Sequence, residues 1–456
     1  MERKSEGQVS IVRDLTNGSV TKLIVMFAMP LFVANALQAV YNLVDMIVVG
    51  QVIGGSGMSA VSIGGDVLHL LTFLAMGFAS AGQVIISQYV GAKKHDMISK
   101  MIGTMFTFLF AIALLMAVVC YLFRYQILDL LNTPAESYQY TMDYMVICIC
   151  GLGFIYGYNI VSAILRGMGD SRRPFVFIAI AAIINTILDI YFVVFCKMGV
   201  AGAALATVIG QGISFLISLI YLYRKKEEFG FDFCRKSFRI TGEVLKPLLV
   251  LGIPMAIQSA AINISKIVLT AWINAEGVIY SALAGIYNKS SMMMGIVSNS
   301  FTTAGSTMTG QSIGAKKYDR VPKILKVVLT ISLVIAMSAS VALFCFPDVI
   351  FTLFTNDQEV LEKATLVVMP IILNFFGCAT RAGAFSLING SGNSRLNLLV
   401  ALIDGIMGRI GLAALFGYVL KWYSTGFWYG DAVAGFAPIL IGTIFFLSGR
   451  WRKGVQ

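Results

Sequence analysis

Long apolar segments separated by short polar breaks extend through the chain from Leu23 to Leu447. A helix that spans a membrane needs about 20 mainly apolar residues, and twelve segments here reach that length. They cover approximately residues 22–48, 58–86, 100–123, 140–165, 174–196, 200–223, 247–273, 280–309, 324–346, 360–387, 396–419 and 427–449. The pattern predicts an all-α integral membrane protein with twelve transmembrane helices.

The composition supports this interpretation. Of the 456 residues, 58% are hydrophobic and only 12% are charged, and the mean hydropathy is +0.83. A water-soluble domain carries about 25% charged residues. Most of the chain is therefore expected to lie within the membrane, in contact with lipid.

The basic residues predict the orientation of the chain. Of the 34 lysines and arginines, 26 lie in the N-terminal tail, the loops after even-numbered spans and the C-terminal tail, whereas four lie in the other loops. Cytoplasmic loops carry this excess of positive charge. We expect a multi-pass protein of the plasma membrane with both termini in the cytoplasm. The net charge of +11 does not indicate nucleic acid as a partner, because no continuous basic stripe with interleaved aromatic residues is present.

Two sequence motifs occur twice at nearly the same shift. SQYVGAKKHD at 87–96 returns as GQSIGAKKYD at 310–319, and LRGMGDSRR at 165–173 returns as LINGSGNSR at 387–395. Both copies place their basic loops on the cytoplasmic side, so the repeated unit contains an even number of spans. The repeat predicts two parallel six-helix lobes related by an axis along the membrane normal.

This duplication gives the expected domain organisation. Two similar lobes create a central cavity and suit alternating access by a rocking motion, and a monomer is sufficient because one chain contains both. The expected boundaries are a cytoplasmic tail at 1–21, an N-lobe at 22–223, a cytoplasmic linker at 224–246, a C-lobe at 247–449 and a second cytoplasmic tail at 450–456.

Asp189 is the strongest candidate for chemistry within a span. An ionisable residue in a span is costly and therefore a functional candidate. Asn185 lies four residues earlier, so both side chains project from the same helix face, and Thr207 on a neighbouring span adds a hydroxyl. Carboxylate and amide oxygens suit a sodium ion, and the carboxylate alone can carry a proton. The alternative is a polar pair that only holds helices together.

Asp45 is a second candidate, fifteen residues after Pro30 in the first predicted span. A proline within a helix removes a backbone hydrogen bond and favours a kink. Protonation of a carboxylate on such a helix would provide a means of changing its shape. The alternative is a capping residue near the outer end of the span.

Other charged residues within the spans allow both functional and structural interpretations. Asp66 and Lys289 correspond under the 223-residue shift, and they are expected either to form a structural bridge between lobes or to line the cavity. Asp404 and Arg409 are five residues apart and are expected to form a local structural pair. A structural role is also expected for two further basic residues, Lys266 and Arg381.

No enzyme chemistry is evident in the sequence. A GxxxxGK[ST] phosphate-binding loop is missing, so ATP-driven transport by this chain is disfavoured. The histidines, His69 and His95, form no metal-binding pattern with spaced partners. We expect neither a cofactor nor a metal beyond a sodium ion at the candidate cation site.

The duplicated GAKK loops and the LRGMGD and LINGSGNSR motifs resemble those of the multidrug and toxic compound extrusion (MATE) transporters. This resemblance covers about residues 15–449. It implies a V-shaped pair of six-helix lobes that opens alternately to either side of the membrane. It also implies exchange of protons or sodium ions for amphipathic, often positively charged drugs.

Individual residues also resemble one branch of this family, named after DNA-damage-inducible protein F. The resemblance rests on Pro30, the Tyr41–Asp45 pair and the set formed by Asn185, Asp189 and Thr207. It implies an N-lobe proton or cation site at Asp45, Asn185, Asp189 and Thr207, bending of the first span at Pro30, and a cavity-lining Tyr41.

The chain departs from the other main branch of the family. That branch has a glutamate in the first helix of its second lobe, where the corresponding span here contains Gln258, Asn263 and Lys266. A C-lobe sodium site of that kind is therefore not expected.

The leading functional hypothesis is secondary antiport that exports cationic amphipathic drugs or metabolites in exchange for protons or sodium ions. The alternative within the same superfamily is a flippase for a lipid-linked precursor, which would need a strongly basic cavity. A channel or a receptor-like membrane protein is a further alternative, but buried single carboxylates in duplicated spans fit gated exchange better than an open pore.

Overall fold

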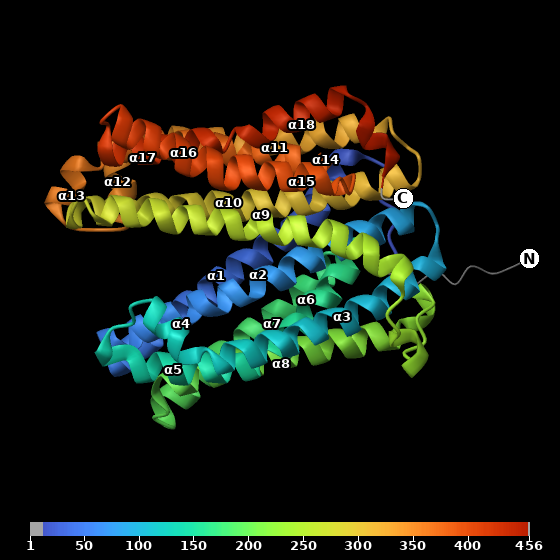
Figure 1. Cartoon of the computed structure of the whole chain (residues 1–456), viewed down its shortest axis with the longest axis horizontal. Helices are drawn as coiled ribbons and strands as arrows, with labels where there is room; N and C mark the ends of the chain where they lie inside the picture. Colours follow the sequence, from blue (N-terminus) through green and yellow to red (C-terminus); the bar gives the residue numbers. More distant parts are fainter. Residues whose placement is uncertain (1–11, 455–456) are drawn as a thin grey trace, which may run out of the picture. The chain divides into compact units, whose positions relative to one another are not determined.

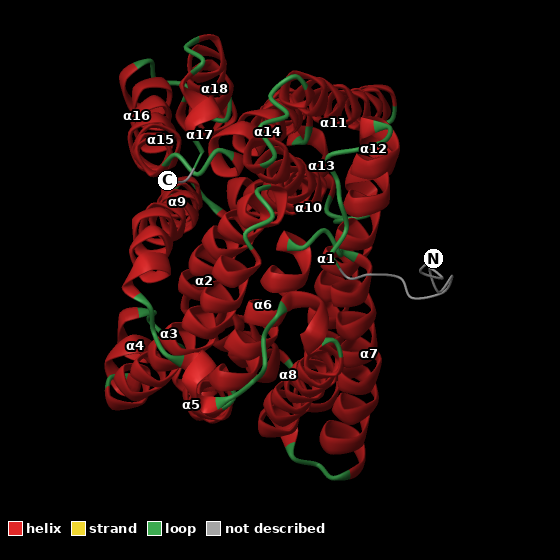
Figure 2. Cartoon of the chain, turned by 90° about the vertical axis from the view of Figure 1, so that its right-hand side faces the viewer, coloured by secondary structure: helices red, strands yellow, loops and turns green. Residues whose placement is uncertain are grey.

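Helices and loops make up the whole of the described part of the chain, residues 12–454 of the computed structural model (Figure 2). Contacts divide this part into two compact units. One contains Val33–Leu249 together with the described residues before Leu15, and the other contains Leu15–Phe32 and the chain from Val250 onward. Each unit is a bundle of long helices (Figure 1).

The first half of the sequence forms seven long helices or helix segments with short connecting ones. They are α1 (Val20–Ile53), α2 (Gly55–Gly91), α3 (His95–Leu122), α4 (Arg124–Leu130), α5 (Ala135–Cys150), α6 (Leu152–Gly167), α7 (Arg172–Asp189), the π-helix η1 (Ile190–Phe195), α8 (Gly199–Arg224) and the 3₁₀ helices η2 (Lys226–Phe229) and η3 (Arg235–Phe238).

The second half repeats this order with more interruptions. Its helices are α9 (Gly242–Asn274), α10 (Val278–Gly314), α11 (Arg320–Cys345), α12 (Pro347–Thr352), α13 (Gln358–Lys363), α14 (Thr365–Gly390), α15 (Ser394–Val400), the π-helix η4 (Ala401–Gly408), α16 (Arg409–Ala414), the π-helix η5 (Leu415–Val419), α17 (Tyr423–Ala434), α18 (Ala437–Leu447) and the 3₁₀ helix η6 (Arg450–Lys453).

The helices account for the twelve expected spans. By length and composition, ten helices or continuous runs of helical segments in the described part of the chain can cross a membrane, and α5 with α6, bent by 50° at their junction, makes an eleventh. The twelfth expected span is α10, which has 37 residues but many serines, threonines and asparagines. The all-α membrane fold predicted from the sequence is confirmed.

The duplication is visible in the backbone as well as in the sequence. Helices α2 and α10 both contain 37 residues and begin 223 residues apart. Each follows a glycine with positive φ, Gly54 at 88° and Gly277 at 119°, a conformation that glycine adopts without steric cost. The GAKK loops also match, with φ of 56° at Lys93 and 58° at Lys316. The two halves are therefore built on one backbone pattern.

Helix α1 contributes to both units. Its N-terminal part buries apolar side chains, among them Ile24, Phe27 and Leu31, in a core with Phe301 and Met308 of the second unit. Inside a membrane such side chains hold helices together through van der Waals packing, which is consistent with the grouping of Leu15–Phe32 with that unit. This division differs from the expected N-lobe, which begins at residue 22.

The linker between the two halves is anchored in the first unit. Phe231 is buried and its ring packs edge-on against Phe233 and Phe238. The side chain of Thr107 donates a hydrogen bond to the Phe238 carbonyl. The Ser237 hydroxyl and a backbone amide donate to Asp232, and these bonds lower the pKa of its carboxyl. The linker is thus a folded element of the first unit.

Candidate functional site

A buried polar cluster lies where α1, α7 and α8 meet in the first unit. Asp45 comes from α1, Asn185 and Asp189 from the last two turns of α7, and Thr207 from α8. Their exposed fractions are 3%, 3%, 0% and 7%, respectively. The four residues expected at the N-lobe site are therefore close to one another and shielded from the surroundings.

Neutral groups hold the Asp45 carboxylate in place. The Thr207 hydroxyl donates to Asp45 Oδ2 at 3.3 Å. With the Asn185 amide turned so that its nitrogen faces Asp45, this nitrogen donates to Asp45 Oδ1 at 3.1 Å, and the amide oxygen accepts from the Thr207 backbone amide at 3.3 Å. Network geometry determines this amide orientation. Both Asp45 oxygens thus have a donor without any basic side chain.

Asp189 completes the cluster as a second carboxyl group. It interacts directly with the Asp45 carboxyl, and its Oδ1 atom is buried without a hydrogen-bond partner among the described residues. Two ionised carboxylates close together in a buried site repel one another, so such a pair favours uptake of a proton or a cation. Asp189 is also the last α-helical residue before the π-helix η1, and π-helical turns are frequent at functional sites.

Tyr41 lies next to this cluster. Its hydroxyl accepts hydrogen bonds from the amides of Gln38 and Gln211, both at 3.4 Å. A small pocket beside the cluster is lined by Tyr41, Ala181, Asn185, Thr207, Gly210 and Gln211. Gln211 was not predicted from the sequence, although its position one turn after Thr207 on the same helix face provides a signal for it.

Three further candidates remain, Pro30, Asp66 and Lys289. Pro30 is inside α1 but in the segment that groups with the second unit. Asp66 on α2 and Lys289 on α10 are exposed and belong to different units. The proposed roles of these three residues stay predictions.

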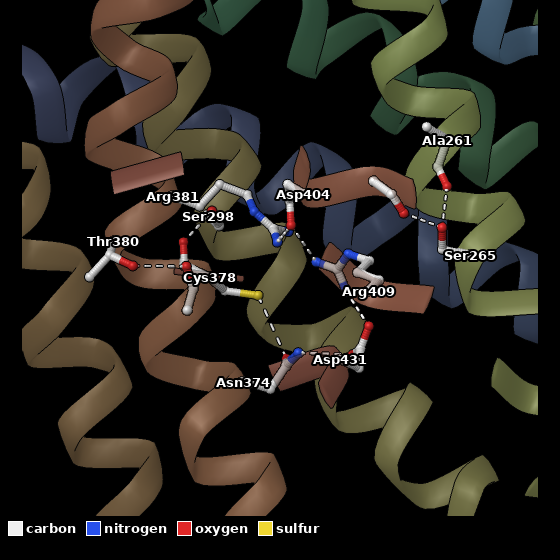
Figure 3. A network of polar contacts seen from close by, with 12 residues as sticks. Ala261, Ser265, Ser298, Asn374, Cys378, Thr380, Arg381, Asp404, Arg409 and Asp431 are labelled. Atoms are coloured by element: carbon white, nitrogen blue, oxygen red, sulfur yellow. Dashed lines mark hydrogen bonds and ion pairs between the residues drawn. The ribbon is translucent and has the colours of Figure 1, made fainter. Parts of the chain in front are cut away.

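A second buried ionic network lies within the second unit (Figure 3). Arg409 and Asp404 form the expected pair, with Nη2 and Oδ1 at 3.3 Å. Arg381 of α14 contacts the same Asp404 oxygen at 3.1 Å, and Arg409 also pairs with Asp431 of α17. The network therefore joins four helical segments, α14, η4, α16 and α17, and is larger than a local pair.

Asp431 is the residue of this network that the sequence analysis missed. Its Oδ2 atom accepts from the Tyr287 hydroxyl at 2.7 Å and from the Asn374 amide at 3.5 Å. A signal was available, since Asp431 is an acidic residue within the last predicted span. Removing one partner of such a buried ion pair leaves the other charge buried without compensation, so the stability of the network depends on all its members.

Buried carboxyl groups inside the spans of a duplicated helical membrane protein are typical of the class of membrane transporters. Comparisons identify the family. The MatE family model matches residues 30–191 and 254–414, one segment in each half. The chain belongs to the MatE family, whose members are transporters and not enzymes.

Relatives and solved structures agree with this assignment. The chain is 29% identical to the "Probable multidrug resistance protein YoeA" of Bacillus subtilis, over 95% of both proteins. It is 24% identical to the "Probable multidrug resistance protein NorM" of Thermotoga maritima, over 95% of this chain and 94% of that protein. An outward-facing structure of a multidrug resistance MATE family transporter matches with a TM-score of 0.87 and 20% identity, over 100% of both chains. This last likeness concerns the fold.

Proposed function

We propose that this protein exports amphipathic organic cations across the plasma membrane in exchange for protons or sodium ions, by alternating access of its two units. The observation that carries the proposal is the Asp45–Asp189 pair. Both carboxyl groups are buried, and neither forms an ion pair with a basic side chain in the described part of the chain.

A site of this kind can bind an ion and release it. The Asn185 amide and the Thr207 hydroxyl hold Asp45, while Asp189 keeps an unpaired oxygen. A proton or a sodium ion would relieve the repulsion between the two carboxyl groups. Because no basic side chain of residues 12–454 forms an ion pair with either carboxyl group, the protonation or ion occupancy of the pair depends on the mobile ion, which is what coupling to an ion gradient requires.

The names of the relatives favour drugs as substrates. Both full-length relatives are called multidrug resistance proteins. They therefore favour drug export over the flipping of a lipid-linked precursor. A positively charged substrate is consistent with the acidic character of the first-unit cluster.

Transport by purified protein in liposomes tests the proposal. Efflux of ethidium would be measured with an imposed proton gradient and, separately, with a sodium gradient. We expect one gradient to drive efflux by the wild type. The variant Asp189→Asn should lower the rate at least about tenfold, because an amide carries neither the charge nor the proton of the acid.

The matched control is Asp96→Asn, which makes the same chemical change at an exposed position in the first turn of α3. It should transport like the wild type. Absence of gradient-driven efflux by correctly folded wild-type protein would contradict drug antiport. Undiminished coupled transport by Asp189→Asn would place the coupling site elsewhere.

A further inference from the structure

One face of helix α3 is apolar and exposed, as expected for contact with lipid. In the second half of the helix its large side chains, with exposed fractions between 48% and 68%, are Leu114, Leu115, Val118 and Leu122. Positions three and four apart share a face of a helix. Followed back toward the start of α3, the same face therefore continues through Ala111, Thr107 and Thr104.

The linker between the two halves covers this continuation, beside the first half of α3 (Figure 1). Thr107 donates a hydrogen bond to the Phe238 carbonyl at 2.5 Å, and the Thr241 backbone amide donates to the Thr104 hydroxyl oxygen at 3.3 Å. A Cβ atom at Gly103 would overlap the linker backbone. In this part of α3 the linker thus takes the place that lipid has along the rest of the face.

The length of α3 puts these contacts at the edge of the hydrocarbon layer. That layer is about 30 Å thick, which corresponds to about 20 helical residues at 1.5 Å per residue. Counted back from Leu122, at the end of the exposed apolar face, this length ends near Gly103. The linker around Phe238 therefore lies at the level where the hydrocarbon meets the polar headgroups.

The linker has an aromatic interior and a basic exterior. Its phenylalanine rings pack edge-on against one another. Three basic side chains in and next to η3, namely Arg235, Lys236 and Arg239, are exposed. None of the three forms an ion pair within residues 12–454. These side chains are therefore available to a partner at the headgroup level.

The acidic residues of the linker do not balance its positive charge. Residues 224–246 contain seven basic and four acidic residues, which leaves an excess of three positive charges. Two of the four acids already have basic partners, since Glu228 pairs with Lys225 and Glu243 with Lys100. The Asp232 carboxylate accepts hydrogen bonds from the linker itself. The partner that suits this surface is therefore an anion.

We propose that the linker binds the headgroups of anionic phospholipids through Arg235, Lys236 and Arg239. Basic clusters next to a membrane span attract anionic lipids, and the guanidinium group matches the geometry of a phosphate. A zwitterionic headgroup carries its own cation beside the phosphate and gains less from these side chains. The inference goes beyond the proposed antiport and does not depend on it.

A fluorophore on the exposed native Cys234, next to Arg235, measures which lipids gather at the linker. The full-length protein, lacking its other six cysteines, would be labelled and placed in phosphatidylcholine nanodiscs. These contain an equal small fraction of spin-labelled phosphatidylglycerol or spin-labelled phosphatidylcholine as quencher. We expect phosphatidylglycerol to quench with an apparent affinity at least about threefold higher at low salt. High salt should reduce this preference, because exposed charges are screened.

Variants in this background connect the preference to the basic side chains. The triple variant Arg235→Gln/Lys236→Gln/Arg239→Gln should quench equally with both lipids, because the three charges are absent. The variant Arg235→Lys/Arg239→Lys keeps the charge and should retain most of the preference. The matched control Lys316→Gln/Lys323→Gln/Lys326→Gln removes three exposed lysines between α10 and α11 and at the start of α11. It should leave the preference at Cys234 unchanged.

The experiment involves no gradient and no transport, so its failure is distinguishable from failure of the proposed antiport. Thermal unfolding shows whether each variant is folded. The inference is overturned if the two lipids quench equally in the protein with an unchanged linker, or if the folded triple variant of the linker keeps the preference. Loss of the preference in the α10–α11 control would also overturn it, because the overall charge of the protein would then attract the lipid.

Discussion

Single buried charges in this protein differ in how they are compensated. The Asp45 carboxylate accepts hydrogen bonds from neutral donors and interacts with Asp189. Neither of these two carboxyl groups has a basic partner among the described residues. Arg409 has the opposite situation, because it is 1% exposed and pairs with both Asp404 and Asp431. The first arrangement leaves room for a mobile ion, whereas the second holds helices together.

The role of Arg409 predicts a large loss of stability when it is removed. Arg409→Leu leaves Asp431 without its ion-pair partner and should lower the free energy of unfolding by about 3 kcal/mol. The double variant Arg409→Leu/Asp431→Leu should recover part of this loss, because both charges are then absent. Unfolding of the purified proteins in detergent measures the effect.

The control is Arg395→Leu, an exposed arginine at the start of α15, which should change the stability by less than about 0.5 kcal/mol. A double variant as unstable as the single one would show that Arg409 acts through packing and not through its charge.

Individual residues were partly predictable from the sequence. Intramembrane carboxyls are rare enough that Asp45, Asp189 and Asp404 stood out from their apolar surroundings. Their partners did not stand out, because Arg381 is 23 residues from Asp404 in the chain and only the packing of the helices brings the two together. Spacing along one helix predicts neighbours on that helix and gives no distances to other helices.

At the scale of helices, the ends of the spans followed from the pattern of apolar residues, but their internal breaks did not. Helix α7, for example, begins at Arg172, near the predicted start at 174. The bend at Gly151 and the π-helical segments η1, η4 and η5 were not predicted. A π-helical turn has almost the same composition as an α-helical one, so hydrophobic periodicity does not separate them.

Close helix contacts at equivalent glycines predict a matched pair of destabilising substitutions. A Cβ atom at Gly167 of α6 would lie 2.8 Å from the Gln83 carbonyl oxygen, and one at Gly390 of α14 would lie 2.8 Å from the Ser306 carbonyl oxygen. These contacts are 223 residues apart. Gly167→Ala and Gly390→Ala should each lower the free energy of unfolding by about 1–3 kcal/mol, because the backbones must separate.

The control for both is Gly295→Ala in α10, where a Cβ atom would meet no atom within 4 Å. This change should leave the stability unchanged or raise it by up to about 1 kcal/mol, since alanine favours the helix. Thermal unfolding in detergent compares the three variants. If the two close-contact variants were as stable as the wild type, the neighbouring helices could move apart without loss of stability. The close contact would then not be a structural requirement shared by the two halves.

At the scale of the whole chain, the duplication and the distribution of basic residues make a joint prediction about topology. The repeat requires an even number of spans in each half, and the distribution of positive charges predicts that the N-terminal tail, the linker and the C-terminal tail lie in the cytoplasm. The side of the membrane on which each loop lies is therefore predicted from the basic residues, whereas the positions of the spans are predicted from the apolar segments.

Two native cysteines in the first unit test the orientation directly. Cys196 and Cys234 are both exposed, one before α8 and the other after it. The 26 residues of α8 extend about 39 Å at 1.5 Å per residue, enough to separate the two thiols by the hydrocarbon layer. We expect Cys234, in the linker, to face the cytoplasm and Cys196 to face the outside.

Labelling with a membrane-impermeant maleimide measures this arrangement, using two variants that each retain one of the two cysteines and lack the other six. In right-side-out vesicles the reagent should label Cys196 at least about tenfold faster than Cys234, because a thiol behind the hydrocarbon layer is reached only by leakage. Inside-out vesicles should reverse this order, and detergent should make both thiols accessible. Labelling of both thiols from one side would mean that α8 does not span the membrane. Faster labelling of Cys234 in right-side-out vesicles would place the linker outside and contradict the orientation predicted from the basic residues.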